Sequence, residues 1–153
     1  MKNELQVKAI KNGTVIDHIN AKNLFKIFSI LQIENFDTEI FIGNNLESKK
    51  FGKKGIIKIA NKFPSIDDMN KIALIDPNAI INIIEDYSVV KKINVELPGD
   101  IDSFVKCINP KCITNYEKVQ TKFKVRQNEI GKIELKCHYC EKITNQDNIE
   151  IIK

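Results

Sequence analysis

The chain of 153 residues has no tryptophan, only two histidines and only one arginine, and its hydrophobic runs are short. No apolar run approaches the roughly 18 residues that a membrane-spanning helix needs, so no membrane association is expected. Two histidines and no phosphate-cradling glycine motif make a catalytic site hard to assemble. His138 lies between two cysteines, and His18 follows Asp17 in a segment expected to be a loop. The sequence therefore favours a non-catalytic protein.

Four cysteines near the C-terminus carry the strongest signal in the chain. They form two short pairs, C-x4-C and C-x2-C, separated by 24 residues: Cys107, Cys112, Cys137 and Cys140. Two such pairs on tight turns can direct four thiolates at one ion, and four thiolates leave no open position for a catalytic water. The alternative is disulfides, but the chain starts with Met1-Lys2-Asn3 and no signal-like segment, so a reducing, cytoplasmic setting is expected. We predict one structural Zn²⁺.

The formal charge of +4 raises the possibility of a nucleic-acid partner. Residues 100–153 contain 10 Lys or Arg and 8 Asp or Glu, a net charge of +2. Four thiolates with one Zn²⁺ contribute −2, so the metal-binding segment is close to neutral. A neutral module binds the phosphate backbone poorly, and a nucleic-acid partner is therefore not expected.

The first two thirds of the chain alternate between strand and helix patterns. Residues 5–10 alternate apolar and polar side chains and predict a strand that ends at Lys11-Asn12-Gly13. Asn20 is a candidate N-cap for an amphipathic helix, whose apolar stripe comprises Ala21, Leu24, Phe25, Ile27, Phe28, Ile30 and Leu31. Strands are predicted at 39–43 and 55–60 around a long polar loop, residues 44–54.

A second helix is predicted to open at a capping box, Ser65 to Asp68, and to stop near Asp76-Pro77. Strands follow at 79–84 and 88–93. The order β-α-β-β-α-β-β predicts an α+β fold, a split βαβ (ferredoxin-like) antiparallel sheet with two helices on one face. Residues 97–100 are a linker, which divides the chain into domains at 1–97 and 98–153. The second is expected to be a small all-β zinc domain with a hairpin at 123–126 and 132–136 and a closing strand at 148–152.

Two polar features interrupt otherwise apolar or lysine-rich patterns. Lys58 lies between isoleucines, as does Asn82, so each should project from the sheet face opposite to its neighbours, with Lys91 and Lys92 adding positive charge. From the pattern alone, the solvated face of an antiparallel sheet is the simpler explanation. Arg126 is the single arginine, and its planar fork could hold a carboxylate of a partner chain or simply be solvated.

These residues occur together with longer strings that resemble a known family. The strings are residues 5–10, G-T-V-I-D-H-I at 13–19, residues 57–59 and L-K-C-H-Y-C-E-K at 135–142. With the four-cysteine spacing, the whole chain resembles the regulatory chain of aspartate carbamoyltransferase. The resemblance implies an N-terminal allosteric domain that binds nucleoside triphosphates (CTP, ATP, UTP) and a C-terminal zinc domain that docks on the catalytic chain. It implies control of de novo pyrimidine biosynthesis by a non-catalytic regulatory subunit.

The resemblance also implies roles for individual residues on the open sheet face. The base would be recognised by Lys58 and by the backbones of Ile10 and Tyr87. The ribose would contact Asp17 and Val89, and the phosphates would be held by Asn82 and Lys92. His18 would lie near the triphosphate, and Val7 beside the sugar or base. Family members pair through their N-terminal domains into dimers that bridge catalytic trimers. The first cysteine turn, residues 107–112, and Asn128 depart from the family pattern. The candidates for the catalytic-chain contact are Asn109, Arg126, Tyr139 and Glu141.

Two other classes of protein remain open at this point. A zinc-ribbon nucleic-acid-binding protein would be retained on DNA in a salt-sensitive way. A small zinc enzyme would show turnover by the isolated chain. A regulatory subunit would show neither property and would bind triphosphates saturably.

Overall fold

The computed structural model describes residues 9–49 and 52–152. The chain divides into two compact units, Met1–Glu96 and Leu97–Lys153. The predicted mixed α+β architecture is confirmed, with a helix-bearing N-terminal sheet followed by an all-β unit that contains the four cysteines.

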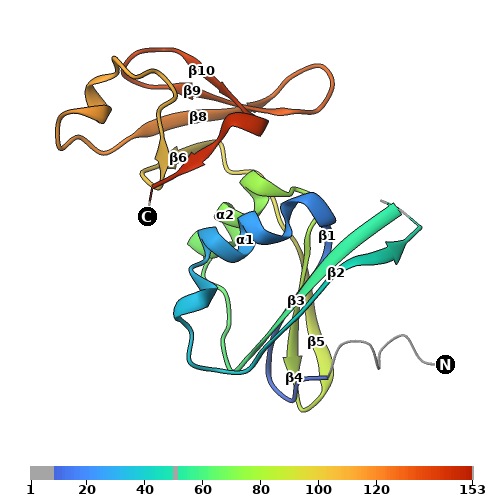
Figure 1. Ribbon diagram of the computed structural model, residues 1–153. Helices are drawn as coiled ribbons and strands as arrows, with labels where there is room; N and C mark the ends of the chain where they lie inside the picture. The colour runs from blue at the N-terminus through green and yellow to red at the C-terminus, as the bar shows by residue number, and fades with distance from the viewer. Residues whose placement is uncertain (1–8, 50–51, 153) are drawn as a thin grey trace. The chain divides into compact units, whose positions relative to one another are not determined.

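The N-terminal unit is an antiparallel sheet of five strands with two helices on one face (Figure 1). Along the sheet the strands follow the order β2-β3-β1-β4-β5. The strands are β1 (Gly13–Asn20), β2 (Ile40–Ser48), β3 (Gly52–Ala60), β4 (Ile80–Glu85) and β5 (Ser88–Asn94). The helices are α1 (Leu24–Ile30) and α2 (Ile66–Ile75), with 3-10 turns η2 (Ala21–Asn23) and η3 (Ile33–Asn35). This is the predicted split βαβ arrangement with β5 added at one edge.

The first strand lies later in the chain than the sequence analysis placed it. Most of the predicted strand at 5–10 lies outside the described residues, and residues 9 and 10 are not in a strand. Instead β1 begins at Gly13 and includes Asp17 and His18, so the expected loop there is wrong. β1 is central, and Thr14, Val15 and Ile16 are all buried, so the alternation that reveals a half-exposed strand is missing.

The predicted long loop between β2 and β3 is also wrong. Both strands continue through the polar segment, β2 to Ser48 and β3 from Gly52, with a register shift between Gly43 and Leu46. Backbone pairing does not require apolar side chains, and lysines near an exposed sheet edge discourage pairing with other chains. The polar composition of 44–54 therefore concealed the continuation of both strands.

The two helices differ in how well the sequence predicted them. The Ser65 side chain accepts a hydrogen bond from the Asp68 amide, and the Asp68 carboxylate accepts one from the Ser65 amide, which confirms the capping box of α2. Asn20 caps the 3-10 turn η2 rather than α1 itself. Phe25 was placed in the predicted apolar stripe but is 65% exposed. Because α1 is only two turns long, only a narrow stripe of it faces the core, formed by Leu24, Ile27 and Ile30.

A buried carboxylate ties the end of β1 to the end of α2. Asp76 is 2% exposed and accepts hydrogen bonds from the Asn20 amide at 2.7 Å, the Asn78 amide at 3.1 Å and the Asn23 side chain at 3.2 Å. These bonds replace the water that the carboxylate loses on burial.

The C-terminal unit consists of short strands around a small core of Ile101, Phe123, Ile133 and Leu135. Its elements are β6 (Asp100–Asp102), β7 (Val105–Lys106), η4 (Ile113–Asn115), β8 (Lys122–Gln127), β9 (Ile133–Cys137), β10 (Ile143–Asn145), η5 (Gln146–Asn148) and β11 (Glu150–Ile151). They pair as β10-β9-β8-β6 and β11-β7. The predicted β8-β9 hairpin and closing strand β11 are present. β6, β7 and β10 have only two or three residues, too few to show a period.

Candidate functional site

The four cysteines of the C-terminal unit meet at one point. Their sulfur atoms lie within 4.8 Å of one another, and three of the four residues are buried. Sγ of Cys107 is 3.6 Å from Sγ of Cys140, and Sγ of Cys112 is 3.8 Å from Sγ of Cys137. A tetrahedral Zn²⁺ with Zn–S bonds of about 2.3 Å places its sulfur atoms about 3.8 Å apart. The donor set and its spacing therefore fit one zinc ion.

Backbone turns hold each pair of cysteines in this arrangement. Cys137 ends β9, and the following turn is closed by the Glu141 amide, which donates to the Cys137 carbonyl at 3.0 Å. Glu141 has φ +62°, the left-handed conformation that reverses the chain beside Cys140. The Cys112 amide donates to the Asn109 carbonyl at 3.0 Å, and the Asn115 side chain donates to the same carbonyl. Both pairs are thus fixed by local hydrogen bonds.

The surroundings of the thiols differ. Burial, together with the neighbouring cysteines, raises the pKa of Cys107 above its ordinary value, and burial raises the pKa of Cys137. Burial also acts to raise the pKa of Cys140, but hydrogen bonds from the Lys142 backbone and the Asn109 side chain prevail and lower it to about 7. A divalent cation offsets the cost of burying the other thiolates. The unit holds one structural zinc ion, and its four sulfur ligands leave no catalytic position.

The register of the N-terminal sheet brings the predicted polar residues into one row. Phe41 of β2 is opposite Lys58 of β3, Lys58 is opposite Val15 of β1, Val15 is opposite Asn82 of β4, and Asn82 is opposite Lys92 of β5. Directly opposed residues of antiparallel strands share a face. Their neighbours Ile57, Ile59, Ile16 and Ile81 are buried on the face that the helices cover. The row therefore crosses the open face.

Two polar members of this row, Asn82 and Lys58, are affected by burial. The side-chain oxygen of Asn82 is buried, and among the described residues it has no hydrogen-bond partner. Burial lowers the pKa of Lys58 from its ordinary value, although the charge of Asp17 opposes the shift. A buried amide oxygen without a partner is costly in the absence of a ligand or a water. The Asn82 oxygen is therefore a position on this face at which a polar ligand or a water could bind.

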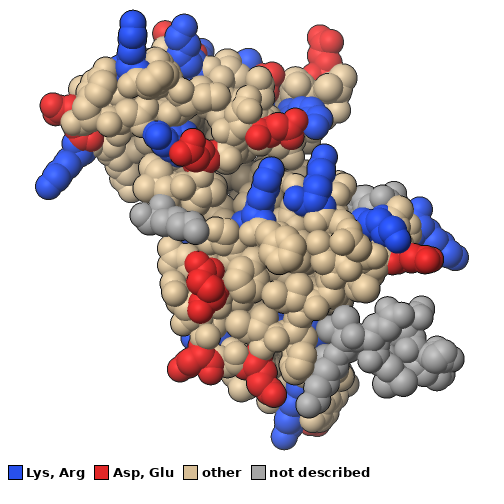
Figure 2. Space-filling view, viewed as in Figure 1, with Lys and Arg blue, Asp and Glu red and all other residues tan. Residues whose placement is uncertain are grey.

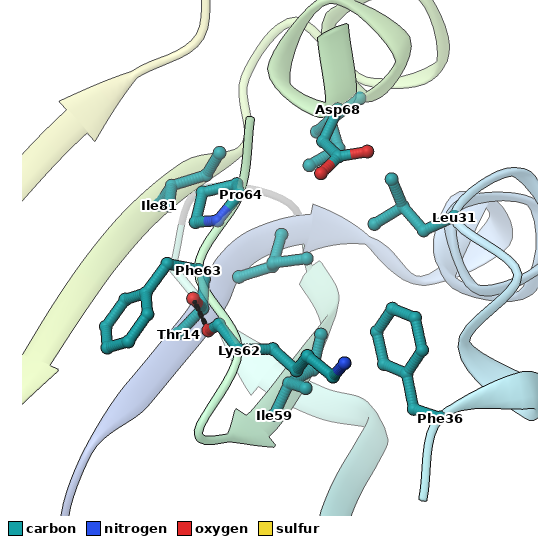
Figure 3. Close-up of a pocket in the computed structure, with 11 residues that line it drawn as sticks. Thr14, Leu31, Phe36, Ile59, Lys62, Phe63, Pro64, Asp68 and Ile81 are labelled. Carbon is teal, nitrogen blue, oxygen red and sulfur yellow. Dashed lines mark hydrogen bonds between the residues drawn. The ribbon is translucent and has the colours of Figure 1, made fainter. Parts of the chain in front are cut away.

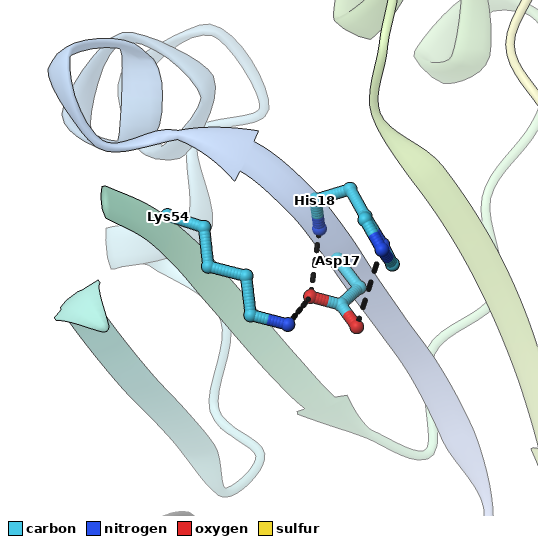
Figure 4. Close-up of polar contacts among 3 residues, drawn as sticks. All are labelled: Asp17, His18 and Lys54. Carbon is cyan, nitrogen blue, oxygen red and sulfur yellow. Dashed lines mark hydrogen bonds and ion pairs between the residues drawn. The ribbon is translucent and has the colours of Figure 1, made fainter. Parts of the chain in front are cut away.

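Asp17 lies on the same face, at a bulge of β1 (Figure 4). Its Oδ1 accepts hydrogen bonds from the His18 amide at 2.7 Å and from Lys54 Nζ at 3.0 Å. The pairing of β1 with β3 shifts between Ile16 and Ile19, and His18 takes φ +58° there. The bulge changes the direction in which the Asp17 and His18 side chains point, an effect that bulges near binding sites often have.

The structure places the other predicted residues around the β4–β5 turn. The Tyr87 amide donates a hydrogen bond to the Lys11 carbonyl at 2.9 Å. This bond holds the β4–β5 turn next to Ile10, the residue before Lys11. Ile10 packs against Val15 and Ile84, and the exposed Val89 is paired opposite Ile84. Val7 lies outside the described residues.

The sequence analysis missed Lys54 and Phe41 on this face. Lys54 is four residues before Lys58 on one strand, so the period of two could have identified it if the strand had been predicted to extend that far. Phe41 required the register of β2 with β3.

The four candidates for a partner contact are divided between two places. Asn109, Tyr139 and Glu141 belong to the cysteine turns, where Tyr139 is 40% exposed. Arg126 lies near the tip of the β8–β9 hairpin, where its Nε donates to Oε1 of Glu134 at 2.9 Å across the two strands. An intrachain carboxylate is thus already one partner of the single arginine.

The surface in view carries lysines and acidic side chains close to one another (Figure 2). No extended field of one sign is visible on this surface, and such a field is the usual mark of nucleic-acid binding. Among the described residues, no helix is both long enough and apolar enough to cross a bilayer.

The fold and the metal centre define a class of protein, a small two-unit chain whose zinc is structural and whose open sheet face is polar. Comparison with known families identifies the particular one. Residues 5–96 match the family described as "Aspartate carbamoyltransferase regulatory chain, allosteric domain", and residues 99–150 match its "metal binding domain". The chain belongs to the family of aspartate carbamoyltransferase regulatory chains, which confirms the resemblance noted in the sequence.

Individual relatives agree over nearly the whole length. The aspartate carbamoyltransferase regulatory chain of Parabacteroides distasonis is 53% identical over 98% of this chain and 96% of its own length. That of Bacteroides fragilis is 50% identical over 99% and 97%, respectively. The chain is a non-catalytic regulatory subunit, and the alternative of a zinc-ribbon nucleic-acid-binding protein is not favoured.

Proposed function

We propose that the open face of the N-terminal sheet binds a nucleoside triphosphate, CTP, ATP or UTP, and that residues 1–97 act as the allosteric domain. The observation that carries this proposal is the single row Lys58, Val15, Asn82 and Lys92, with a buried Asn82 oxygen that has no partner among the described residues. The row places one ammonium group at each end, Lys58 and Lys92, with Val15 and Asn82 between them, which suits a base at one end and phosphates at the other.

Positions on this face suggest how the ligand would lie. Lys92 is exposed on the edge strand β5 and can meet phosphates as a point charge, with Asn82 beside it. Lys58, half-buried in β3, can read the base together with backbone groups near Ile10 and Tyr87. Asp17 and Val89 remain for the ribose, His18 for the triphosphate, and Val7 for the sugar or base.

A bound nucleotide would act on the catalytic chains through its different affinity for two states of the assembly. Such a coupling is reciprocal and is typically ~1–3 kcal/mol. Purine and pyrimidine triphosphates could then compete for one face and shift the equilibrium in opposite directions. This mechanism would give control of de novo pyrimidine biosynthesis without any catalytic group in this chain.

Residues 98–153 would dock on the catalytic chain of aspartate carbamoyltransferase. The cysteine turns expose apolar side chains, Ile108 and Tyr139, next to the polar Asn109 and Glu141, as interfaces with a polar rim often do. Arg126 would add a charged contact at the hairpin tip. The N-terminal unit would pair with a second copy, so that dimers bridge catalytic trimers in the cytoplasm, without a membrane or nucleic-acid partner.

Calorimetry with the zinc-loaded chain tests the nucleotide proposal. Lys92→Ala should weaken CTP and ATP together by about tenfold, because a point charge contacts phosphates common to both. Lys58→Ala should change the ratio of the two affinities, because a base contact discriminates between them. Lys118→Ala, an exposed lysine of the other unit, is the control. Unchanged binding in both sheet variants would exclude this face.

A further inference from the structure

A cavity of about 280 Å³ lies on the helix-covered side of the N-terminal sheet, away from the row described above. Its floor comes from three adjacent strands, through Ile16 of β1, Ile59 of β3 and Ile81 of β4. Leu31 and Phe36, which follow α1, border the cavity (Figure 3), and Ile72 of α2 completes the apolar lining. The volume is slightly below the ~300–1,000 Å³ usual for ligand pockets, so only a compact molecule fits.

Two groups of opposite charge border this apolar space. Nζ of Lys62 is 5.2 Å from the centre of the Phe36 ring, and the Lys62 carbonyl accepts a hydrogen bond from the buried hydroxyl of Thr14. Asp68 borders the cavity from the first turn of α2 (Figure 3), where one of its oxygens accepts from the Ser65 amide. Within residues 9–49 and 52–152, neither Lys62 nor Asp68 forms an ion pair.

We propose that this cavity binds a compact apolar α-amino acid. Its side chain lies against Ile16, Ile59 and Ile81, its carboxylate faces Lys62, and its ammonium faces Asp68. The charge complementarity selects this occupant, since a hydrocarbon would leave both charges unused and a simple carboxylate would leave Asp68 unpaired. The apolar floor selects against polar amino acids, whose side chains lose hydration without a partner.

The position of the cavity gives its occupant a route to the open face. Successive side chains of a strand point to opposite faces, so each floor residue is followed or preceded by a residue of the row: Val15 beside Ile16, Lys58 beside Ile59 and Asn82 beside Ile81. A molecule in the cavity that displaces the floor residues would therefore also shift the row residues on the opposite face of the sheet. This coupling rests on the proposed nucleotide function, whereas the binding itself does not.

The test is a titration of the full-length, zinc-loaded chain with L-leucine, followed by NMR of isoleucine δ1-methyl groups in the absence of nucleotide. Saturable shifts are expected at Ile16, Ile59, Ile72 and Ile81, while Ile133 of the C-terminal unit serves as an unperturbed reference. 4-Methylpentanoate, which lacks the ammonium, and 3-methylbutylamine, which lacks the carboxylate, should each bind about tenfold more weakly than leucine. Glycine should cause no shift.

Two charge-removing variants assign the contacts separately. Lys62→Gln should weaken leucine and 4-methylpentanoate but not 3-methylbutylamine. Asp68→Asn keeps an oxygen for the Ser65 amide and should weaken leucine and the amine but not 4-methylpentanoate. Absence of saturable shifts in the four methyl groups, or equal binding of the three probes, would overturn the proposal.

The coupling has its own readout. Saturating CTP should change the affinity for leucine severalfold, because coupled sites affect each other reciprocally. An unchanged leucine affinity in the presence of bound CTP would overturn the coupling. If CTP does not bind at all, the proposed function fails while the leucine shifts still decide the site.

Discussion

At the scale of single residues, the open face contains side chains that lower the stability of the folded sheet. Lys58 is half-buried between apolar neighbours, and the Asn82 oxygen is buried without a partner among the described residues. Such groups cost free energy in the absence of a ligand and are typical of binding surfaces. The same view applies to Arg126, whose neighbour Glu134 occupies only part of its donor fork.

Replacing Lys58 by methionine should leave the free energy of unfolding at neutral pH unchanged or raise it. Because the pKa of Lys58 is lowered in the folded state, its protonated form opposes folding at every pH below that pKa. This cost disappears as the pH rises through the folded-state pKa toward the unfolded one. The advantage of Lys58→Met should therefore shrink at alkaline pH.

Urea unfolding of the zinc-loaded chain, followed by the methyl signals of the N-terminal unit, measures this difference. Lys92→Met, which removes an exposed lysine of the same row, is the matched control and should change stability by less than about 0.5 kcal/mol. A parent chain that is more stable than Lys58→Met at neutral pH would contradict the reasoning.

Arg126 is expected to hold the catalytic chain through its guanidinium. Arg126→Ala should weaken assembly with the catalytic trimer by ~2–5 kcal/mol if the arginine is buried against an acidic partner, and Arg126→Lys should also weaken it because the fork is lost. Lys124→Ala, two residues earlier on β8 and paired with Asp100, is the control. Equal assembly of both Arg126 variants and the parent, measured by native mass spectrometry, would make Arg126 an ordinary surface residue.

At the scale of elements, β1 organises the N-terminal unit. It pairs with both β3 and β4, contributes Val15 to the open face and Ile16 to the helix-covered face, and bulges at Asp17 and His18. Its first residue, Gly13, adopts φ +142°, a conformation essentially restricted to glycine. A Cβ at this position would lie 2.1 Å from the Ile59 carbonyl oxygen of β3.

Gly13→Ala should therefore destabilise the N-terminal unit by at least about 2 kcal/mol, since backbone strain and a clash with backbone atoms add together. Gly52→Ala is the matched variant: φ is +79°, but none of the described residues lies within 4 Å of the added Cβ, so about 1 kcal/mol is expected. Thermal unfolding with detection in the N-terminal unit gives both values. Similar losses for the two variants would show that the close approach of Gly13 to β3 contributes nothing.

At the scale of the whole molecule, the two units obtain their stability in different ways. The N-terminal unit buries an isoleucine-rich layer between sheet and helices. The C-terminal unit, of 57 residues by the division at Leu97, has short strands and a small core, and a domain of this size often depends on a metal.

Removal of zinc should unfold the C-terminal unit and release the catalytic chain while the N-terminal unit stays folded. Thiolate ligation to structural zinc contributes on the order of 10 kcal/mol in small domains, more than such a core supplies by itself. Cys137→Ala or chelation should show this as loss of dispersed NMR signals from residues 97–152 only. His138→Ala, between the two ligands but not one of them, should keep the zinc. Elemental analysis showing no zinc in freshly purified parent protein would contradict the assignment.

Much of this architecture could be predicted from sequence, because the relevant signals are local. The spacing of the four cysteines indicated the metal centre, the Ser65 to Asp68 pattern indicated the start of α2, and the neighbours of Lys58 and Asn82 indicated an opposite sheet face. In each case the physical cause acts over a few residues: a knuckle, a cap or a period of two.

Only the tertiary structure decided how these local pieces meet. The strand register placed Lys58, Val15, Asn82 and Lys92 in one row, and it depends on which strands are neighbours rather than on any one of them. β1 escaped prediction because its consecutive residues are buried on both faces, by the helices on one side and, at Val15, by Ile10, Ala60 and Ile84 on the other, which removes the alternation. Lys54 beside Asp17, Glu134 beside Arg126 and the cavity behind the row arise likewise from contacts between residues distant in sequence, which no local pattern encodes.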